Sequence, residues 1–228
     1  MPRQEPGATR QVLVWDLPTR AFHWLLAGLV VVAFVSGKRG HMDVHFIVGY
    51  AILTLVLFRL IWGVIGSRTA RFADFVRGPG AMLAYVRGLR GDGAEPPALG
   101  HNPLGGAMVV VMLALLLAQA TTGLFTTDDI FTDGPLVGLV SASLVKTLST
   151  VHRVAIDALV ILVALHVAAI ALYRVVKGEN LVLPMLTGRK AVAADRVVDP
   201  PRRTPAVVAL LALAVAAAVV AAVVNLAG

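Results

Sequence analysis

Four histidines lie in strongly apolar stretches of the sequence: His23, His45, His152 and His166. An imidazole inside an apolar, membrane-like segment is costly unless it is paired or binds a metal, so each is a candidate functional group. On one α-helix, the 14 residues from His152 to His166 turn to within about 40° of the same face and rise about 21 Å. This spacing predicts two stacked sites.

Each site needs a second ligand. We pair His45 with His152 at the outer level and His23 with His166 at the inner level. A lone zinc ion usually takes four ligands, and no cysteine or well-placed carboxylate completes such a set. A planar cofactor that brings four nitrogens of its own needs only two axial ligands, as in b-type haem. The spacing therefore predicts two haems b with these four histidines as iron ligands.

Small and basic residues around the histidines fit this prediction. Gly49 follows His45 by one helical turn, and small side chains allow a flat ring to approach; Ala27, Ala155 and Ala169 are placed in the same way, although the helices are alanine-rich throughout.

Haem propionates need cations. Arg59 lies 14 residues after His45, so we expect it either to meet an inner propionate, with Arg20 as a second candidate, or to extend to the inner headgroups. Lys38, Arg39 and Arg153 are the candidates at the outer haem.

Other polar residues have weaker claims. Asp157 is expected to pair with Arg153 four residues before it, with proton transfer as the alternative. His101 is expected to mark a turn and helix entry before Pro103, or to serve the inner cofactor or a quinone pocket. We expect solvated side chains at His41 and at Asp128, Asp129 and Asp133, where docking of a basic periplasmic protein is the alternative.

Composition indicates a membrane protein. The 228 residues are 58% hydrophobic and 14% charged, with a mean hydropathy of +0.83, far more apolar than a typical soluble domain. With no cysteine, the chain has no disulfide, no thioether-linked haem and no thiolate metal site. The net charge of +7 fits orientation signals in loops, and nucleic-acid binding is not expected.

Five apolar runs are long enough to cross a bilayer. We predict an all-α integral membrane protein, in which residues 1–188 form a four-helix transmembrane bundle enclosing the haems. Asp16 or Thr19 would cap an early start of the first helix, although this run also resembles a cleavable signal peptide. A basic linker (189–205) leads to an additional transmembrane helix expected to pack or anchor. The expected spans are 21–37, 44–66, 103–125, 150–173 and 206–227.

Lysine and arginine predict the orientation. The N-terminal arm, the loop at 67–102 and the segment after 173 are rich in both, whereas the opposite side carries few. The positive-inside rule places the N-terminus in the cytoplasm and, after five crossings, the C-terminus in the periplasm of a bacterial inner membrane. Two amphipathic stretches are expected to lie on the surfaces, residues 70–91 inside and 134–149 outside.

The chain resembles the prokaryotic cytochrome b561 family, which includes the b-type cytochrome subunits of nickel–iron hydrogenases. "VWDLPTRAFHWLL", "HFIVGYAILTLVLFRLIWGVIGS", "ARFADFVRGP", "GHNPLGG" and the two histidines of "VHRVAIDALVILVALH" carry the resemblance from Val14 to Gly188. It implies a four-helix core that binds two b haems and conducts electrons across the inner membrane, between a quinone pool and an external redox partner. The family's ligand positions match the same four histidines.

Three functions follow as hypotheses. The leading one is electron transfer between quinone and a periplasmic cytochrome c, dehydrogenase or hydrogenase subunit. The second is superoxide oxidation at the outer haem with quinone as acceptor, for which Lys38, Arg39, His41, Lys146 and Arg153 would attract the anion. The third is a metal-ion transporter whose histidines bind the ion directly. Catalysis by the chain alone is left open.

Overall fold

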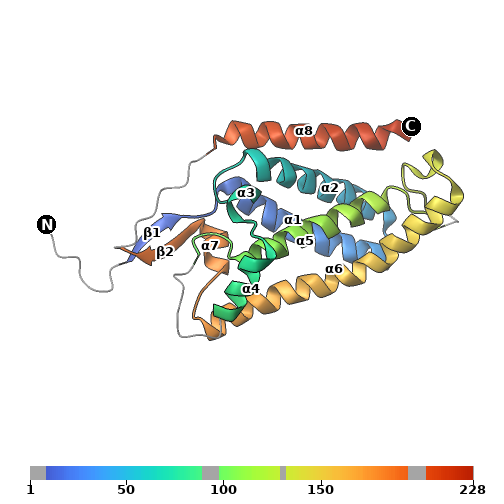
Figure 1. Ribbon diagram of the computed structural model, residues 1–228. Helices are drawn as coiled ribbons and strands as arrows, with labels where there is room; N and C mark the ends of the chain where they lie inside the picture. The colour runs from blue at the N-terminus through green and yellow to red at the C-terminus, as the bar shows by residue number, and fades with distance from the viewer. Residues whose placement is uncertain (1–8, 89–97, 129–131, 195–203, 228) are drawn as a thin grey trace.

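Five long apolar helices form an elongated bundle in the computed structural model, which describes residues 9–88, 98–128, 132–194 and 204–227 (Figure 1). Each is long and apolar enough to cross a membrane, which confirms the predicted all-α integral membrane fold. The helices are α1 (Leu17–Arg39), α2 (Met42–Ile65), α5 (Pro103–Gly123), α6 (Ala142–Val176) and α8 (Ala206–Val224).

The two ends of the bundle are built differently. At the open end, a short turn connects α1 to α2, and a loop with the short helix η1 (Val137–Leu139) joins α5 to α6. The other end, which we call the capped end, is closed by small elements (Figure 1). They are β1 (Thr9–Leu13), β2 (Arg189–Ala193), α3 (Phe72–Phe75), α4 (Pro79–Gly88) and α7 (Val182–Thr187).

Local signals set the helix ends. Asp16 is the residue that caps α1, since its Oδ1 accepts a hydrogen bond from the Thr19 N–H at 2.8 Å. The helix ends at Gly40, whose φ of 72° is a left-handed conformation that glycine adopts without strain. Asn102 caps α5 in the same way, and Pro103 follows at its first position.

Helix α6 is longer than expected. It begins at Ala142, whereas the sequence predicted a start at 150 and placed 134–149 along the outer face. Ser141 caps it, and the buried side chains of Val145 and Ser149 lie one turn apart on a single face. Ser149 accepts a hydrogen bond from the Thr127 N–H at 3.2 Å. Residues 142–149 contact the α5–α6 loop through these side chains, so they form the first two turns of α6 instead of a separate surface segment.

A two-stranded antiparallel sheet was not predicted. Strands β1 and β2 pair from Thr9 opposite Ala193 to Leu13 opposite Arg189. The predicted linker therefore begins with a strand, and its residues 195–203 lie outside the described part. Gly188, at φ 81°, ends α7 just before β2, and a Cβ there would lie 2.7 Å from the Trp15 carbonyl oxygen.

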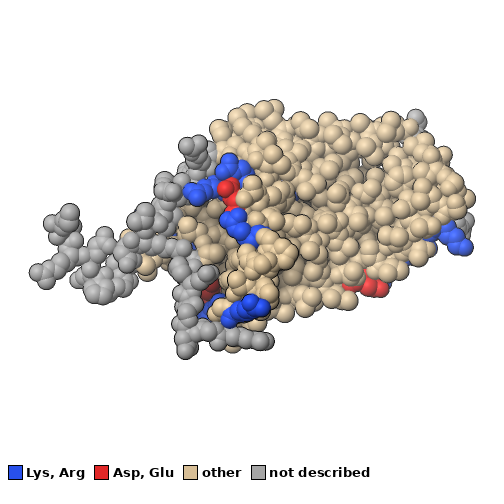
Figure 2. Space-filling view, viewed as in Figure 1, with Lys and Arg blue, Asp and Glu red and all other residues tan. Residues whose placement is uncertain are grey.

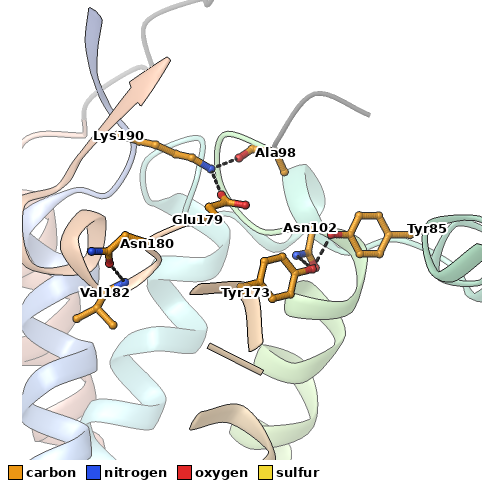
Figure 3. Close-up of polar contacts among 8 residues, drawn as sticks. All are labelled: Tyr85, Ala98, Asn102, Tyr173, Glu179, Asn180, Val182 and Lys190. Carbon is orange, nitrogen blue, oxygen red and sulfur yellow. Dashed lines mark hydrogen bonds and ion pairs between the residues drawn. The ribbon is translucent and has the colours of Figure 1, made fainter. Parts of the chain in front are cut away.

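Side-chain hydrogen bonds fasten the capped end (Figure 3). The hydroxyl of Tyr85 on α4 lies 2.6 Å from that of Tyr173 on α6. The Tyr173 hydroxyl also accepts a hydrogen bond from Asn102 Nδ2 at 2.8 Å. Lys190 on β2 donates to the Ala98 carbonyl at 2.8 Å and pairs with Glu179. The amphipathic stretch 70–91, as far as it is described, thus forms α3 and α4 at this end, tied to the bundle.

The last helix packs along α2, as expected for a packing helix. Its buried face is a stripe of small residues, and its other faces expose leucine and valine, as a lipid-facing helix does. Small residues let two membrane helices approach closely, where van der Waals contact holds them. The buried stripe is Ala209, Ala212, Ala216 and Val220.

Gly63 on α2 leaves room for the Phe72 ring of α3. A Cβ at this position would lie 2.0 Å from Phe72 Cε2. We expect Gly63→Ala to lower the free energy of unfolding by about 1–3 kcal/mol, the usual cost of overpacking, measured by thermal unfolding in detergent. Gly28→Ala is the control, because nothing lies within 4 Å of its added Cβ. Equal stability of the two variants would contradict this packing.

Candidate functional site

The structure brings His45 and His152 together near the open end. His45 lies near the start of α2 and His152 lies on α6. Their ring centroids are 6.2 Å apart and their planes are nearly perpendicular, at 88°. Both side chains are half-buried between helices. The open-end pair is thus a juxtaposition of two imidazoles from elements far apart in the sequence.

Backbone carbonyls of the neighbouring helices fix the tautomer of both rings. His45 Nδ1 lies 2.9 Å from the carbonyl oxygen of Ala33 on α1, and His152 Nδ1 lies 2.8 Å from that of Gln119 on α5. A carbonyl oxygen can only accept, so each Nδ1 carries the proton and donates it. The Nε2 lone pair of each ring is therefore left for a metal, which is how metal-binding histidines are usually held.

Two glycines make room for these rings. A Cβ on Gly37 of α1 would lie 3.0 Å from His45 Nδ1, and a Cβ on Gly123 of α5 would lie 3.0 Å from His152 Cε1. The sequence analysis missed both glycines and the two carbonyls. A signal existed for Gly37, because it and His45 stand four residues on either side of His41 in a tight helical hairpin.

The Gln119 side chain also contacts His152. Its Nε2 donates to the His152 carbonyl at 3.1 Å and lies 3.3 Å from His152 Nε2. Its Oε1 is buried and has no hydrogen-bond partner among the described residues. A metal bound at Nε2 would take the lone pair that this amide contacts, so binding requires the Gln119 side chain to turn away.

His23 on α1 and His166 on α6 form the capped-end pair. Their ring centroids are 6.4 Å apart and their planes are inclined at 52°. His23 Nδ1 is buried without a hydrogen-bond partner in the described part of the chain. Unlike the open-end pair, neither ring of this pair makes a hydrogen bond to a carbonyl among the described residues.

Each pair has the ring spacing that two imidazoles bound to one metal ion would have. A metal bound to imidazole nitrogens at about 2 Å separates the two ring centroids by roughly 6 Å, close to the spacing of both pairs. Among the described residues there is no group of three or more His, Asp or Glu that could hold a metal ion. The donor set therefore suits a metal whose other ligands come from a cofactor, as in haem.

Arg59 lies deep in the bundle. It is 2% exposed, which excludes the alternative that it extends to the headgroups. Its guanidinium lies 4.9 Å from the centroid of Phe72 and 6.0 Å from that of Phe75. Its Nη1 has no hydrogen-bond partner among the described residues. The Asp16 carboxylate acts on this guanidinium electrostatically, but no ion pair joins Arg59 to a described residue. A buried cation without a paired anion is expensive, so this site suits a further anionic group such as a propionate.

Arg20 is engaged with the protein. Its Nη1 donates a hydrogen bond to the carbonyl of Leu186 on α7. Its Nε is buried and has no partner among the described residues. Trp24, one turn further along α1, donates to the Met185 carbonyl at 3.2 Å. These contacts tie α7 to α1, which gives Arg20 a structural role that the sequence analysis did not anticipate.

His101 is held between two aromatic rings. Its centroid lies 4.7 Å from that of Trp15 and 4.4 Å from that of Phe75, and its Nδ1 is buried without a described partner. Burial, with smaller contributions from the charges of Arg59 and His166, lowers the pKa of His101 to about 3. The predicted helix entry is confirmed at its neighbours, where Asn102 caps α5.

This pKa predicts a pH dependence of stability. Because the folded-state pKa of His101 is about 3 and the unfolded value is about 6.5, the unfolded chain binds more protons between these limits. The contribution of neutral His101 to the free energy of unfolding is therefore fully present above pH 6.5 and is lost as the pH falls below that value. We expect His101→Phe, which keeps an aromatic ring, to remove about 1–2 kcal/mol of the destabilisation between pH 6.5 and 5. Thermal unfolding of both proteins at these two pH values tests this. If the loss of stability between pH 6.5 and 5 is the same in the variant as in the wild type, the prediction is wrong.

The remaining candidates lie at the surface. Arg153 and Asp157 are exposed, and the expected ion pair between them is absent from the described residues. Gly49 is half-buried, and nothing lies within 4 Å of a Cβ added there. Ala155 is half-buried, and Ala27 and Ala169 are exposed. Asp129 lies outside the described residues. The other exposed candidates are Lys38, Arg39, His41, Asp128 and Asp133.

Five apolar helices and two half-buried histidine pairs are the arrangement expected of a membrane cytochrome of the b type. The family profile of the prokaryotic cytochromes b561 matches residues 14–188, and the chain belongs to this family. The probable Ni/Fe-hydrogenase B-type cytochrome subunit of Rhodobacter capsulatus is 24% identical over 223 residues, which cover 82% of this chain and 84% of that protein. No solved structure matches the chain. The chain is thus a multi-pass membrane protein that transfers electrons, and the family implies haem b as its cofactor.

Proposed function

We propose that this chain carries electrons across the bacterial inner membrane through two haems b, between a quinone pool and a periplasmic redox partner. His23 and His166 hold one haem, and His45 and His152 hold the other. The observation that carries the proposal is that the four histidines form two pairs, at two levels of α6. In each pair the ring centroids are as far apart as those of two imidazoles bound to one metal.

The levels suit passage across the bilayer. His152 and His166 lie about 21 Å apart along α6, so the two pairs serve opposite halves of the membrane. When bound, haem supplies a one-electron iron couple whose potential depends on its ligands, burial and hydrogen bonds. The chain orients the imidazoles, half-buries them between its helices, and offers Arg59 to a propionate at the capped end.

Charge supports an orientation with the capped end in the cytoplasm. Lysine and arginine gather at the two ends of the visible face and leave the middle free, as a membrane-spanning belt requires (Figure 2). The capped end has the larger share, which the positive-inside rule assigns to the cytoplasm. Besides the buried Arg59, its described basic residues are Arg10, Arg20, Arg68, Arg71, Arg77, Arg87, Arg174, Lys177, Arg189 and Lys190, against Lys38, Arg39, Lys146 and Arg153 at the open end.

The orientation assigns the partners to sides. The open-end pair faces the periplasm, where a cytochrome c, dehydrogenase or hydrogenase subunit would exchange electrons; the relative from Rhodobacter capsulatus is named as a hydrogenase subunit, which supports the last of these. Quinone exchanges electrons with the capped-end haem, and His101, held between Trp15 and Phe75, is the candidate for that site.

Proteoliposomes test this function. We expect quinol in the membrane to reduce an impermeant acceptor such as ferricyanide through the wild-type protein. His152→Ala should slow this reduction at least tenfold while the remaining haem still equilibrates with quinol. An equal rate in the variant would mean that electrons do not pass through the open-end pair, and would overturn the proposal.

Exposed cations at the open end keep superoxide oxidation as a second candidate. Lys38 and Arg39 are exposed beside His41 on the α1–α2 turn, and Lys146 and Arg153 are exposed on α6. Cations of this kind raise the local concentration of an anion. Reduction of the haems by superoxide, with quinone as the final acceptor and no added protein partner, would favour this function.

A further inference from the structure

We propose that α1 and α5 hold the open-end histidines in a way that makes the open-end haem the lower-potential centre, so that electrons move downhill from the open end to the capped end. This inference rests on the proposed function. It concerns Ala33 and Gly37 on α1 and Gln119 and Gly123 on α5, none of which binds the iron.

The hydrogen bonds are the first argument. Both open-end imidazoles donate Nδ1–H to a backbone carbonyl, at 2.9 Å from Ala33 and 2.8 Å from Gln119. Such a bond makes the imidazole a stronger electron donor to its metal. A stronger donor stabilises ferric over ferrous iron and lowers the reduction potential. No such bond is present at the described surroundings of His23 and His166.

Charge acts in the same direction. The buried guanidinium of Arg59 lies at the capped end, with Nη1 unpartnered in the described chain. A cation in a low-dielectric environment stabilises the reduced, less positive iron and raises its potential. Both effects therefore make the reduction potential of the open-end haem lower than that of the capped-end haem.

A backbone carbonyl cannot be removed by substitution, but the glycines beside the two rings can be replaced. Such variants change the hydrogen bonds indirectly. In Gly37→Ala the new Cβ would lie 3.0 Å from His45 Nδ1, and in Gly123→Ala it would lie 3.0 Å from His152 Cε1 and 3.3 Å from Nδ1. These contacts are tighter than normal, so each ring must shift and its hydrogen bond must lengthen. Gly28→Ala on α1 is the matched control, because its added Cβ meets nothing within 4 Å.

The test is a spectroscopic redox titration of the purified wild type and variants, after haem content and thermal stability have been checked. We expect two components, with the lower one belonging to the open-end haem, assigned with a His166→Ala protein that keeps only that haem. Gly37→Ala and Gly123→Ala should raise the lower component by about a tenfold change in the oxidised-to-reduced ratio, which is 59 mV for one electron. The higher component and the Gly28→Ala control should not move.

Electron paramagnetic resonance gives a second readout. Perpendicular imidazole planes leave two iron d orbitals nearly equal in energy, which makes the low-spin ferric signal strongly anisotropic. We therefore expect the more anisotropic signal from the open-end haem, whose planes meet at 88°, and a reduced anisotropy in both glycine variants. A lower component that belongs to the capped-end haem, or that fails to move in these variants, would overturn the inference. Absence of haem would instead overturn the proposed function.

Discussion

Replacing His166 with alanine should remove one of two haems and spare the other. The variant loses one member of the capped-end pair, so His23 alone faces the metal position, while His45 and His152 keep their spacing and their carbonyl partners. We expect the α-band absorbance per protein to fall by about half, because a pair of axial ligands acts as a unit. Pyridine haemochrome quantitation measures this directly.

His41→Ala is the matched control for this loss. His41 is exposed at the start of α2, and its side chain does not cap the helix, so both haems should remain. A His166→Ala protein that still holds two haems, each with two imidazole ligands by electron paramagnetic resonance, would show that our pairing of the histidines is wrong.

Replacing Arg59 with leucine should release the capped-end haem. In the folded chain this guanidinium is 2% exposed and lies against Phe72 and Phe75. Removing one member of a buried pair of charges costs about 3–5 kcal/mol, since the other charge is left without compensation. We therefore expect the affinity for the capped-end haem to fall more than 100-fold, measured as haem lost to a scavenging apoprotein.

Two further variants show whether a loss of haem in Arg59→Leu comes from the missing charge at this position. Arg59→Lys keeps the charge and should retain more haem than Arg59→Leu, although a lysine cannot offer the same fork of donors. Arg71→Leu removes a partly exposed arginine that pairs with Asp74 at the surface and should keep both haems. If Arg59→Leu retains haem as well as Arg71→Leu does, Arg59 has no anionic partner at the cofactor.

The length of the apolar runs was enough to predict the transmembrane helices. The runs of about 20 apolar residues, the cap at Asp16 and the helix entry at Pro103 are local features, and the folded chain has all of them. The register of His152 and His166 is also local, because it depends only on helical geometry. These parts of the fold and site could therefore be predicted from the sequence.

Long-range contacts could not be predicted in the same way. The pairing of β1 with β2 joins segments about 180 residues apart along the chain and leaves no signature in either strand alone. The same holds for the Leu186 carbonyl that accepts from Arg20, and for the start of α6, which depends on packing against Thr127. The carbonyls of Ala33 and Gln119 and the role of Gly123 were missed because they meet the histidine rings only in the folded chain; the spacing of Gly37 from His45 was a signal that the sequence analysis did not use.

The central claim is that two b haems lie between the paired histidines. A dithionite-reduced minus oxidised visible spectrum of the detergent-purified wild-type protein, combined with pyridine haemochrome quantitation, tests it most directly. We predict about two haems b per chain, in agreement with one metal for each histidine pair. A well-folded preparation without haem absorbance, or with a single haem per chain at saturation, would contradict the account.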